Sequence, residues 1–184
     1  MSAARSAHAL VPHPDHRPRA IRGVRVDVTR EREALVLGWV LEGDLDAIRV
    51  PAPVVPGFAQ GLWEHTCFEL FVATDGPDAY HEVNLSPSGA WAVFAFRAYR
   101  VGEPCTDAAL APAIAVRREP GRLLLDARVP LARLSPAYAA ARLRVALTAV
   151  VEEVDGARSY WALRHPRSRP DFHDRDGFAL LLET

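Results

Sequence analysis

Short runs of alternating apolar and polar residues, each ended by proline or glycine, constrain the fold of this 184-residue chain most strongly. In the stretch 23–31, for example, three valines alternate with Arg25 and Asp27. A period of two residues is typical of a β-strand with one face in the core. Fifteen prolines and eleven glycines separate such runs, as in β-sandwiches and β-barrels. We therefore expect an all-β protein.

The pattern predicts about ten or eleven strands. They are expected at 23–31, 33–43, 47–51, 65–73, 79–87, 90–100, 113–119, 122–130, 143–153, 158–164 and 178–184. The segment 131–142 is expected to hold a turn or two of helix. Residues 1–20 should form an N-terminal arm, and residues 21–184 a single domain. The expected architecture is a two-sheet antiparallel β-sandwich, immunoglobulin-like or jelly-roll-like.

Composition excludes several classes of partner. The 22 basic residues are balanced by 23 acidic ones, so no electrostatic surface for nucleic acid or an anionic membrane is expected. Every basic residue is arginine, which removes lysine-based chemistry. Cys67 and Cys105 form neither a disulfide framework nor a C-x-x-C pair. The N-terminus lacks the apolar core of a secretory signal, and no run approaches the ~20 apolar residues of a membrane span. We expect a cytoplasmic protein.

The three central strands, joined by turns at 74–78 and 86–89, sort into two faces. The apolar side of each strand, which on the third carries Phe94 and Phe96, is expected to face the core. The opposite face would then hold Glu69, Glu82, Asn84 and Arg97, with aromatic residues at its margins. Because this face also carries Cys67 and Phe71, types rarely left in water, we interpret it as the floor of a functional groove. A solvated face with weak Glu–Arg pairs is the alternative.

A second polar cluster occupies a proline-rich loop near the C-terminus. It contains Trp161, His165, Asp171, His173 and Asp174. The spacing of the two histidines matches no compact metal motif, and no metal is expected. We favour a loop anchored by two phenylalanines, with both histidines hydrogen-bonded to the backbone.

Other reactive groups are few. The chain has no G-x-S-x-G, G-x-x-x-x-G-K-[ST] or G-x-G-x-x-G motif,. His65 lies two residues from Cys67, about 6–7 Å along a strand, which is too far for a direct hydrogen bond. Cys67 is therefore interpreted as a small, half-buried apolar residue. Glu69 and Glu82 could form an acid/base pair if their strands are adjacent and in register. The sequence leaves that register open.

The run "LWEHTCFELFV…YHEVNLSPSGAWAVFAFRAYR", with "WALRHP…PDFHDRDGFALLL" after it, resembles the bacterial DOMON-like domain proteins. These are stand-alone relatives of the type 9 carbohydrate-binding module, and the resemblance covers nearly the whole chain. It implies a β-sandwich whose superfamily binds sugars in some members and haem in others.

The resemblance also implies a site. In sugar-binding type 9 modules two tryptophans clamp a sugar ring, and an acidic residue and an asparagine bind its hydroxyls. Trp63, Glu69, Asn84 and, as the second wall, Trp161 occupy the corresponding positions; Glu82 departs from the pattern, because a basic residue is expected there. The complete set of candidate ligand-binding residues is Trp63, His65, Glu69, Glu82, Asn84, Arg97, Trp161 and His173.

Three functions are compatible with these residues. The first is a non-catalytic domain that binds a saccharide or a similar polyhydroxylated small molecule, with no cofactor. The second is a haem-binding module. It would need two axial ligands from His65, His81, His165 and His173, or a Cys thiolate, because the only methionine is Met1 and lysine is absent,. The third is an enzyme that uses Glu69 or Glu82 with a nearby histidine.

Overall fold

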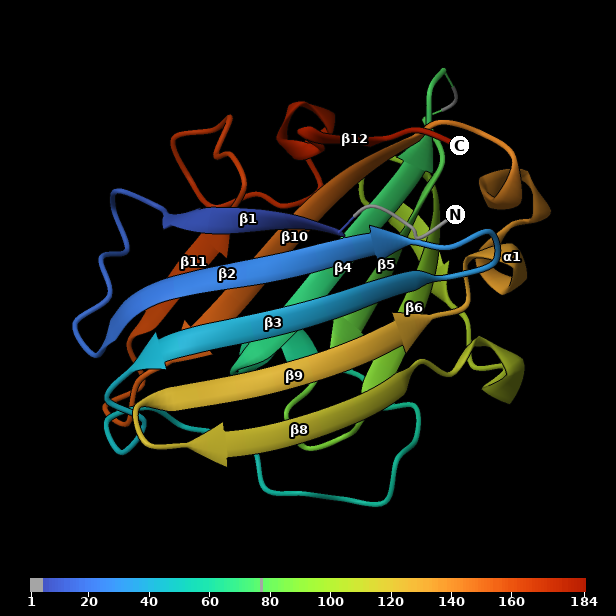
Figure 1. Ribbon diagram of the computed structural model, residues 1–184. Coiled ribbons are helices and arrows are strands. Elements are labelled where there is room, and N and C mark those ends of the chain that lie inside the picture. Colours follow the sequence, from blue (N-terminus) through green and yellow to red (C-terminus); the bar gives the residue numbers. More distant parts are fainter. Residues whose placement is uncertain (1–4, 77) are drawn as a thin grey trace.

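The computed structural model describes residues 5–76 and 78–184 and consists of two antiparallel sheets packed face to face (Figure 1). The first sheet has the order β1 (Arg5–Pro12), β2 (Ile21–Arg30), β3 (Leu35–Gly43), β9 (Arg122–Val129) and β8 (Ala113–Glu119). The second has the order β7 (Val101–Pro104), β6 (Trp91–Ala98), β5 (Tyr80–Leu85), β4 (Cys67–Thr74), β10 (Leu143–Glu152) and β11 (Arg158–Ala162). β12 (Leu180–Leu182) also pairs with β10. The all-β antiparallel sandwich is confirmed, with twelve strands in the described residues.

The two sheets are joined along one side of the sandwich. β1 pairs with β2 over Arg5–Leu10, and its last two residues, Val11 and Pro12, pair with Ala162 and Trp161 of β11. The expected arm at 1–20 therefore contains a strand of the sandwich. Its prolines and small alanines give little apolar signal, and backbone pairing to two strands orders it. Residues 1–4 of the expected arm, and residue 77 of the expected turn at 74–78, lie outside the described residues.

Two further strand assignments differ from expectation. The segment 47–51 forms only an isolated bridge, between Ile48 and Glu153, although Ile48 is buried. Proline at position 51 limits further pairing. Strand β7 was not expected because all four of its residues are exposed. Its hairpin with β6 turns at Arg100, whose φ of 55° is left-handed.

Helical structure is limited to short segments. The helix α1 spans Leu131–Leu134, and 3₁₀ turns span Leu62–Glu64, Ala108–Leu110, Pro136–Ala139 and Arg175–Gly177. The expected short helix in 131–142 is present. Within residues 5–76 and 78–184, no helix is long and apolar enough to cross a membrane.

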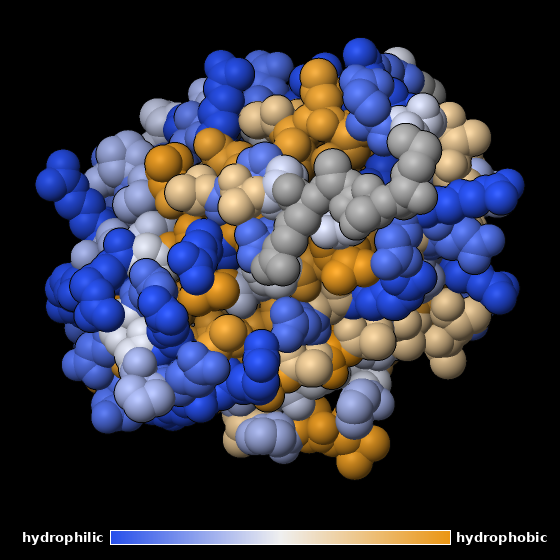
Figure 2. Space-filling model, viewed as in Figure 1, coloured by the Kyte–Doolittle hydropathy of each residue, from blue (hydrophilic) through white to orange (hydrophobic). Residues whose placement is uncertain are grey.

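The core lies between the sheets and follows the two-residue period. Phe68, Leu70 and Val72 of β4 are fully buried and face the first sheet, where the ring of Trp39 lies 5.1 Å from that of Phe68. The other side of the first sheet presents mainly hydrophilic residues, with hydrophobic ones in small separate areas (Figure 2).

A smaller apolar cluster lies on the outer face of the second sheet. It contains Phe71, Tyr80, Ala146 and Phe178, with Phe172 packed against it. The C-terminal segment 163–179 supplies Phe172 and Phe178, and it crosses this face before β12 (Figure 1). The outer face is therefore partly covered by the chain itself, and this cover forms one side of the cleft described below.

Candidate ligand-binding site

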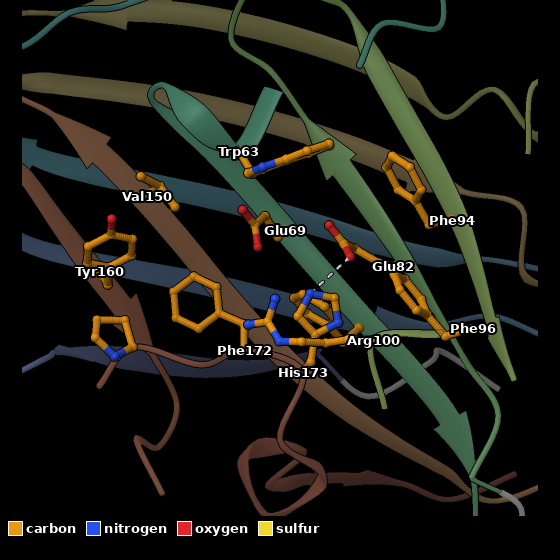
Figure 3. Close-up of a pocket in the computed structure, with 12 residues that line it drawn as sticks. Trp63, Glu69, Glu82, Phe94, Phe96, Arg100, Val150, Tyr160, Phe172 and His173 are labelled. Atoms are coloured by element: carbon orange, nitrogen blue, oxygen red, sulfur yellow. Dashed lines mark ion pairs between the residues drawn. The ribbon is translucent and has the colours of Figure 1, made fainter. Parts of the chain in front are cut away.

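A cleft of about 320 Å³ opens on the outer face of the second sheet (Figure 3). Strands β4, β5, β6, β10 and β11 contribute to it, together with the 3₁₀ turn at Leu62–Glu64 and the C-terminal segment. Its lining residues are Trp63, Glu69, Phe71, Glu82, Phe94, Phe96, Arg100, Val150, Tyr160, Pro170, Phe172 and His173.

Two glutamates from neighbouring strands form the floor. Glu69 pairs with Asn84, and Phe71 pairs with Glu82, in the antiparallel register of β4 and β5. The two glutamates are therefore diagonal neighbours on one face, and the carboxyl group of Glu82 points toward Glu69 (Figure 3),. This settles the register that the sequence left open: the strands are adjacent, and both carboxyl groups line one cleft.

Each carboxyl group is held by one neutral donor. Thr148 on β10 donates to Oε2 of Glu69 at 3.2 Å, and the Asn84 amide donates to Oε1 of Glu82 at 2.7 Å. Oε1 of Glu69 is buried and has no hydrogen-bond partner in the described residues. Neither residue is more than 5% exposed. The floor thus holds two acids, and no arginine whose side chain the structure describes is bonded to either.

Burial shifts the ionisation of both acids. Desolvation raises the pKa of Glu82 to about 7, against the lowering effects of the Asn84 hydrogen bond and of Arg100. Desolvation, reinforced by Glu82, raises the pKa of Glu69 well above its ordinary value of 4.5,. Near neutral pH the floor therefore keeps protons that exposed glutamates would have lost.

His173 lies beside these acids, and its two ring nitrogens face different partners. The backbone N–H of Arg100 donates to the Tyr80 hydroxyl at 3.2 Å, and we assign the hydroxyl proton to its 2.8 Å hydrogen bond with Nδ1 of His173. Nε2 then carries the imidazole proton, 3.7 Å from Oε2 of Glu82. Desolvation, followed by Arg100, lowers the pKa of His173 to about 4. The ring is neutral and presents its N–H toward Glu82.

Asp171 fixes the C-terminal segment at the mouth of the cleft. It accepts hydrogen bonds from the guanidinium of Arg100 at 2.9 Å, the hydroxyl of Tyr99 at 2.5 Å and the backbone N–H of His173 at 3.1 Å. Arg100, the arginine that lines the cleft, is therefore already ion-paired. The loop that carries His173 is tied to the β6–β7 turn.

Aromatic rings form the walls. Trp63 is 39% exposed and meets Phe94 edge-to-face, with ring centroids 5.5 Å apart. Phe96 stacks on Tyr80, and Phe172 contacts Tyr160 at the opposite side. The other three tryptophans are buried, so Trp63 is the one presented to a ligand. Figure 3 shows it above the two glutamates.

The eight residues selected from the sequence fall into three groups. Trp63, Glu69, Glu82 and His173 line the cleft. Asn84 is fully buried beneath it and holds Glu82. His65, Arg97 and Trp161 do not line the cleft.

Each of these three departures has a physical reason. His65 turns toward Glu152, 2.8 Å away, instead of toward Glu69. Phe94 pairs with Glu82 and therefore lies on the cleft side of β6. Arg97, three residues later, lies on the opposite side with Val93 and is exposed near the end of the strand. Trp161 is 3% exposed and packs in the core, with its indole N–H donated to Ser159. The expected second tryptophan wall is therefore absent from the cleft.

The sequence analysis missed several lining residues. Phe94 and Phe96 were assigned to the core because they are apolar, although the alternation puts them opposite Val93. Arg100 occupies the place expected for Arg97. Tyr160 and Phe172 come from a distant strand and loop, and only the fold brings them to this face.

The four candidate histidines do not face one common cavity in the described chain. Of the four candidates only His173 lines the cleft; His65 bonds to Glu152, His81 to Tyr138 and His165 to the carbonyl of Val11. Bis-histidine ligation needs two such groups facing one cavity. Cys67 is buried next to Asn84, and desolvation raises the pKa of its thiol, which disfavours a thiolate ligand,. No group of three or more metal-ligating residues occurs in the part of the chain that the structure describes.

Comparison with known proteins identifies a shared fold. No protein-family model matches the chain, and no curated protein matches it. The structure of a candidate carbohydrate-binding protein from Bacteroides uniformis is similar, with a TM-score of 0.70 and 15% identity over 94% of this chain and 83% of that one. Two structures of a family 9 carbohydrate-binding module from Caldicellulosiruptor kristjanssonii, in complex with cellotriose or glucose, match at a TM-score of 0.45. Their sequences are 11% and 10% identical to this chain. Each alignment includes 79% of this chain, and it includes 70% of the cellotriose complex and 71% of the glucose complex. The chain therefore shares the β-sandwich fold of the Bacteroides protein.

Proposed function

We propose that this protein is a non-catalytic domain that binds a saccharide, or a similar polyhydroxylated small molecule, in the cleft on the second sheet. The observation that carries the proposal is the combination of an exposed Trp63, further aromatic walls and a floor of two buried acids. The fold shared with the Bacteroides uniformis protein agrees with it.

The two kinds of surface suit the two kinds of group on a sugar. The C–H face of a pyranose ring packs against aromatic faces, as Trp63 and Phe172 offer at the sides of the cleft. Ring hydroxyls need buried hydrogen-bonding partners, which Glu69, Glu82 and the N–H of His173 supply. A volume of about 320 Å³ lies at the small end of ligand pockets, which suits a ligand of one or two rings.

A fluorescence titration tests the proposal. Purified protein is titrated with mono- and disaccharides, nucleotide sugars and cell-wall fragments, and tryptophan emission and thermal stability are followed together. We expect a saturable change in wild-type protein. In Trp63→Ala the affinity should fall at least about tenfold, which corresponds to about 1.4 kcal/mol of binding free energy. Arg97→Ala is the matched control, since Arg97 is an exposed residue of β6 outside the cleft. No response to any member of the panel by folded protein would reject the proposal.

Catalysis is the second candidate, favoured by the neighbouring acids Glu69 and Glu82. One protonated and one ionised carboxyl group on a shared floor is an arrangement used for acid/base chemistry. A saccharide ligand that is slowly hydrolysed by wild-type protein, and not by Glu82→Gln, would favour this candidate over simple binding.

A further inference from the structure

The floor of the cleft has acids without a basic partner. Among the described residues Glu69 forms no ion pair, and the one such contact of Glu82 is with His173 at 3.7 Å. His173 is neutral, because burial of the ring, followed by Arg100, lowers its pKa to about 4. A buried acid without a cation is unusual, since its ionised form lacks both water and a counter-charge.

Arg100 does not supply the missing charge. Its guanidinium lines the cleft and lowers the pKa of Glu82 somewhat, but its ion pair is with Asp171 at 2.9 Å. It also receives no contact from either floor acid within ion-pair distance in the described structure. In the part of the chain that the structure describes, the cleft, counted with Asp171, therefore has one arginine and three carboxyl groups.

The walls above these acids are aromatic. Trp63, Phe94 and Phe96 lie on one side and Phe172 and Tyr160 on the other (Figure 3). Cations bind favourably over the faces of such rings, and more strongly where water is excluded. Aromatic walls over unpaired carboxyl groups suit a ligand with a positive charge better than a neutral one.

We propose that the cleft selects an amino sugar, with its protonated amine held over Glu69 and Glu82 and its ring against the aromatic walls. This inference rests on the proposed function and names the ligand class within it. Each acid has one oxygen held from the sheet, by Thr148 or Asn84, and Oε1 of Glu69 has no partner. An ammonium group has three donors and can bond to both acids at once.

Binding of an amine would change the protonation of the floor. The positive charge stabilises the ionised carboxyl groups, so an acid that holds a proton in the free protein releases it when the amine binds. A neutral sugar does not favour ionisation and bonds to the acids in the protonation states that they already have. Proton release therefore distinguishes the two ligands.

Isothermal titration calorimetry of the full chain tests the inference. The ligands are glucose, N-acetylglucosamine and glucose with an amine at C2 or at C6, at pH 6 and pH 8 in two buffers of different protonation enthalpy. We expect one of the amines to bind at least tenfold more tightly than the neutral sugars and to release protons, with more released at pH 6. Glu69→Gln and Glu82→Gln should each reduce the affinity for the amine more than that for glucose. Arg97→Ala should change neither.

The possible results separate this inference from the proposed function. Equal affinity for the amines and the neutral sugars, without proton release, would overturn the amine preference and leave the saccharide site standing. Binding of none of these ligands, nor of the wider saccharide panel, would overturn both. Circular dichroism and thermal denaturation of the glutamine variants establish that they are folded, so that lost affinity is attributable to the cleft.

Discussion

The hydroxyl of Tyr80 on β5 lies 2.8 Å from Nδ1 of His173 in the C-terminal segment, and it also accepts the backbone N–H of Arg100. We assign the hydroxyl as the donor in this pair, which places the imidazole proton on Nε2. It also links the strand that holds Glu82 to the loop that closes the cleft.

The first prediction concerns the tautomer of His173. In wild-type protein we expect Nε2–H to be the sole neutral form, with no protonation down to about pH 5, because burial and Arg100 lower the pKa to about 4. Nitrogen-15 NMR of the ring reports both. In Tyr80→Phe the preference should relax toward a mixture, with a stability loss of about 1 kcal/mol for one hydrogen bond. An unchanged ring spectrum in Tyr80→Phe would contradict the proposed tautomer assignment.

The second prediction concerns stability against pH, where Glu82 and His173 act in opposite directions. The pKa of Glu82 is raised to about 7 in the folded protein, so its contribution is present below about 4.5 and is lost as pH rises through 7,. The pKa of His173 is lowered to about 4, so its contribution is present above 6.5 and is lost as pH falls toward 4.

Urea unfolding at pH 5 and pH 7 separates these two effects. Between pH 5 and pH 7, the free energy of unfolding of Glu82→Gln should rise by about 2 kcal/mol relative to that of wild type. The free energy of unfolding of His173→Gln should fall by about 2 kcal/mol relative to that of wild type over the same range. Parallel curves for all three proteins would show that neither group has the environment described above.

The third prediction concerns Phe178, which anchors the C-terminal segment. Its ring is fully buried, 5.9 Å from that of Phe71 and 5.6 Å from that of Tyr80. Phe178→Ala should lower the free energy of unfolding by about 3–5 kcal/mol, and hydrogen exchange should increase in 163–179 before it does in β4. Val154→Ala, at an exposed turn position, should stay within about 0.5 kcal/mol,. A small effect at Phe178 would mean that the segment is held by other contacts.

The fourth prediction concerns the two thiols. Cys67 is buried, and desolvation, followed by Glu69, raises its pKa well above 9.0, whereas Cys105 is partly exposed. A thiol reagent at pH 8 should therefore modify Cys105 alone in native protein and both cysteines in urea, as counted by mass spectrometry. In Cys105→Ser we expect no native reaction. Rapid labelling of Cys67 without denaturant would indicate that the sheet opens at β4.

Much of the fold could be predicted from the sequence because alternation is a local signal. Runs such as 23–31 and 122–130 show which side chains share a face, and the structure gives β2 and β9 there. Strand β1 was missed because part of its order comes from β11, which is distant in sequence, and β7 was missed because its four exposed residues form no buried stripe.

The site could be predicted only in part for the same reason. Glu69, Glu82 and Asn84 were grouped correctly because they follow one alternation across a single hairpin. Phe94 was expected in the core and Arg97 on the cleft face, and each lies on the other face, because apolar character was given more weight than alternation. Tyr160 and Phe172 were out of reach, since their approach to β4 depends on β10, β11 and the course of the C-terminal segment.

The pairing of β1 with both β2 and β11 has a consequence for self-association. With that side of the sandwich closed, the strand order ends in β7 and β8, and such edges can pair with other chains. β8 carries Arg117, Arg118 and Glu119, all exposed, and β7 has four residues and ends at Pro104. Charge on one edge, and brevity with a proline on the other, disfavour edge-to-edge growth into aggregates. The N-terminal strand thus joins the two sheets along one side, and both ends of the strand order carry features that disfavour pairing with another chain.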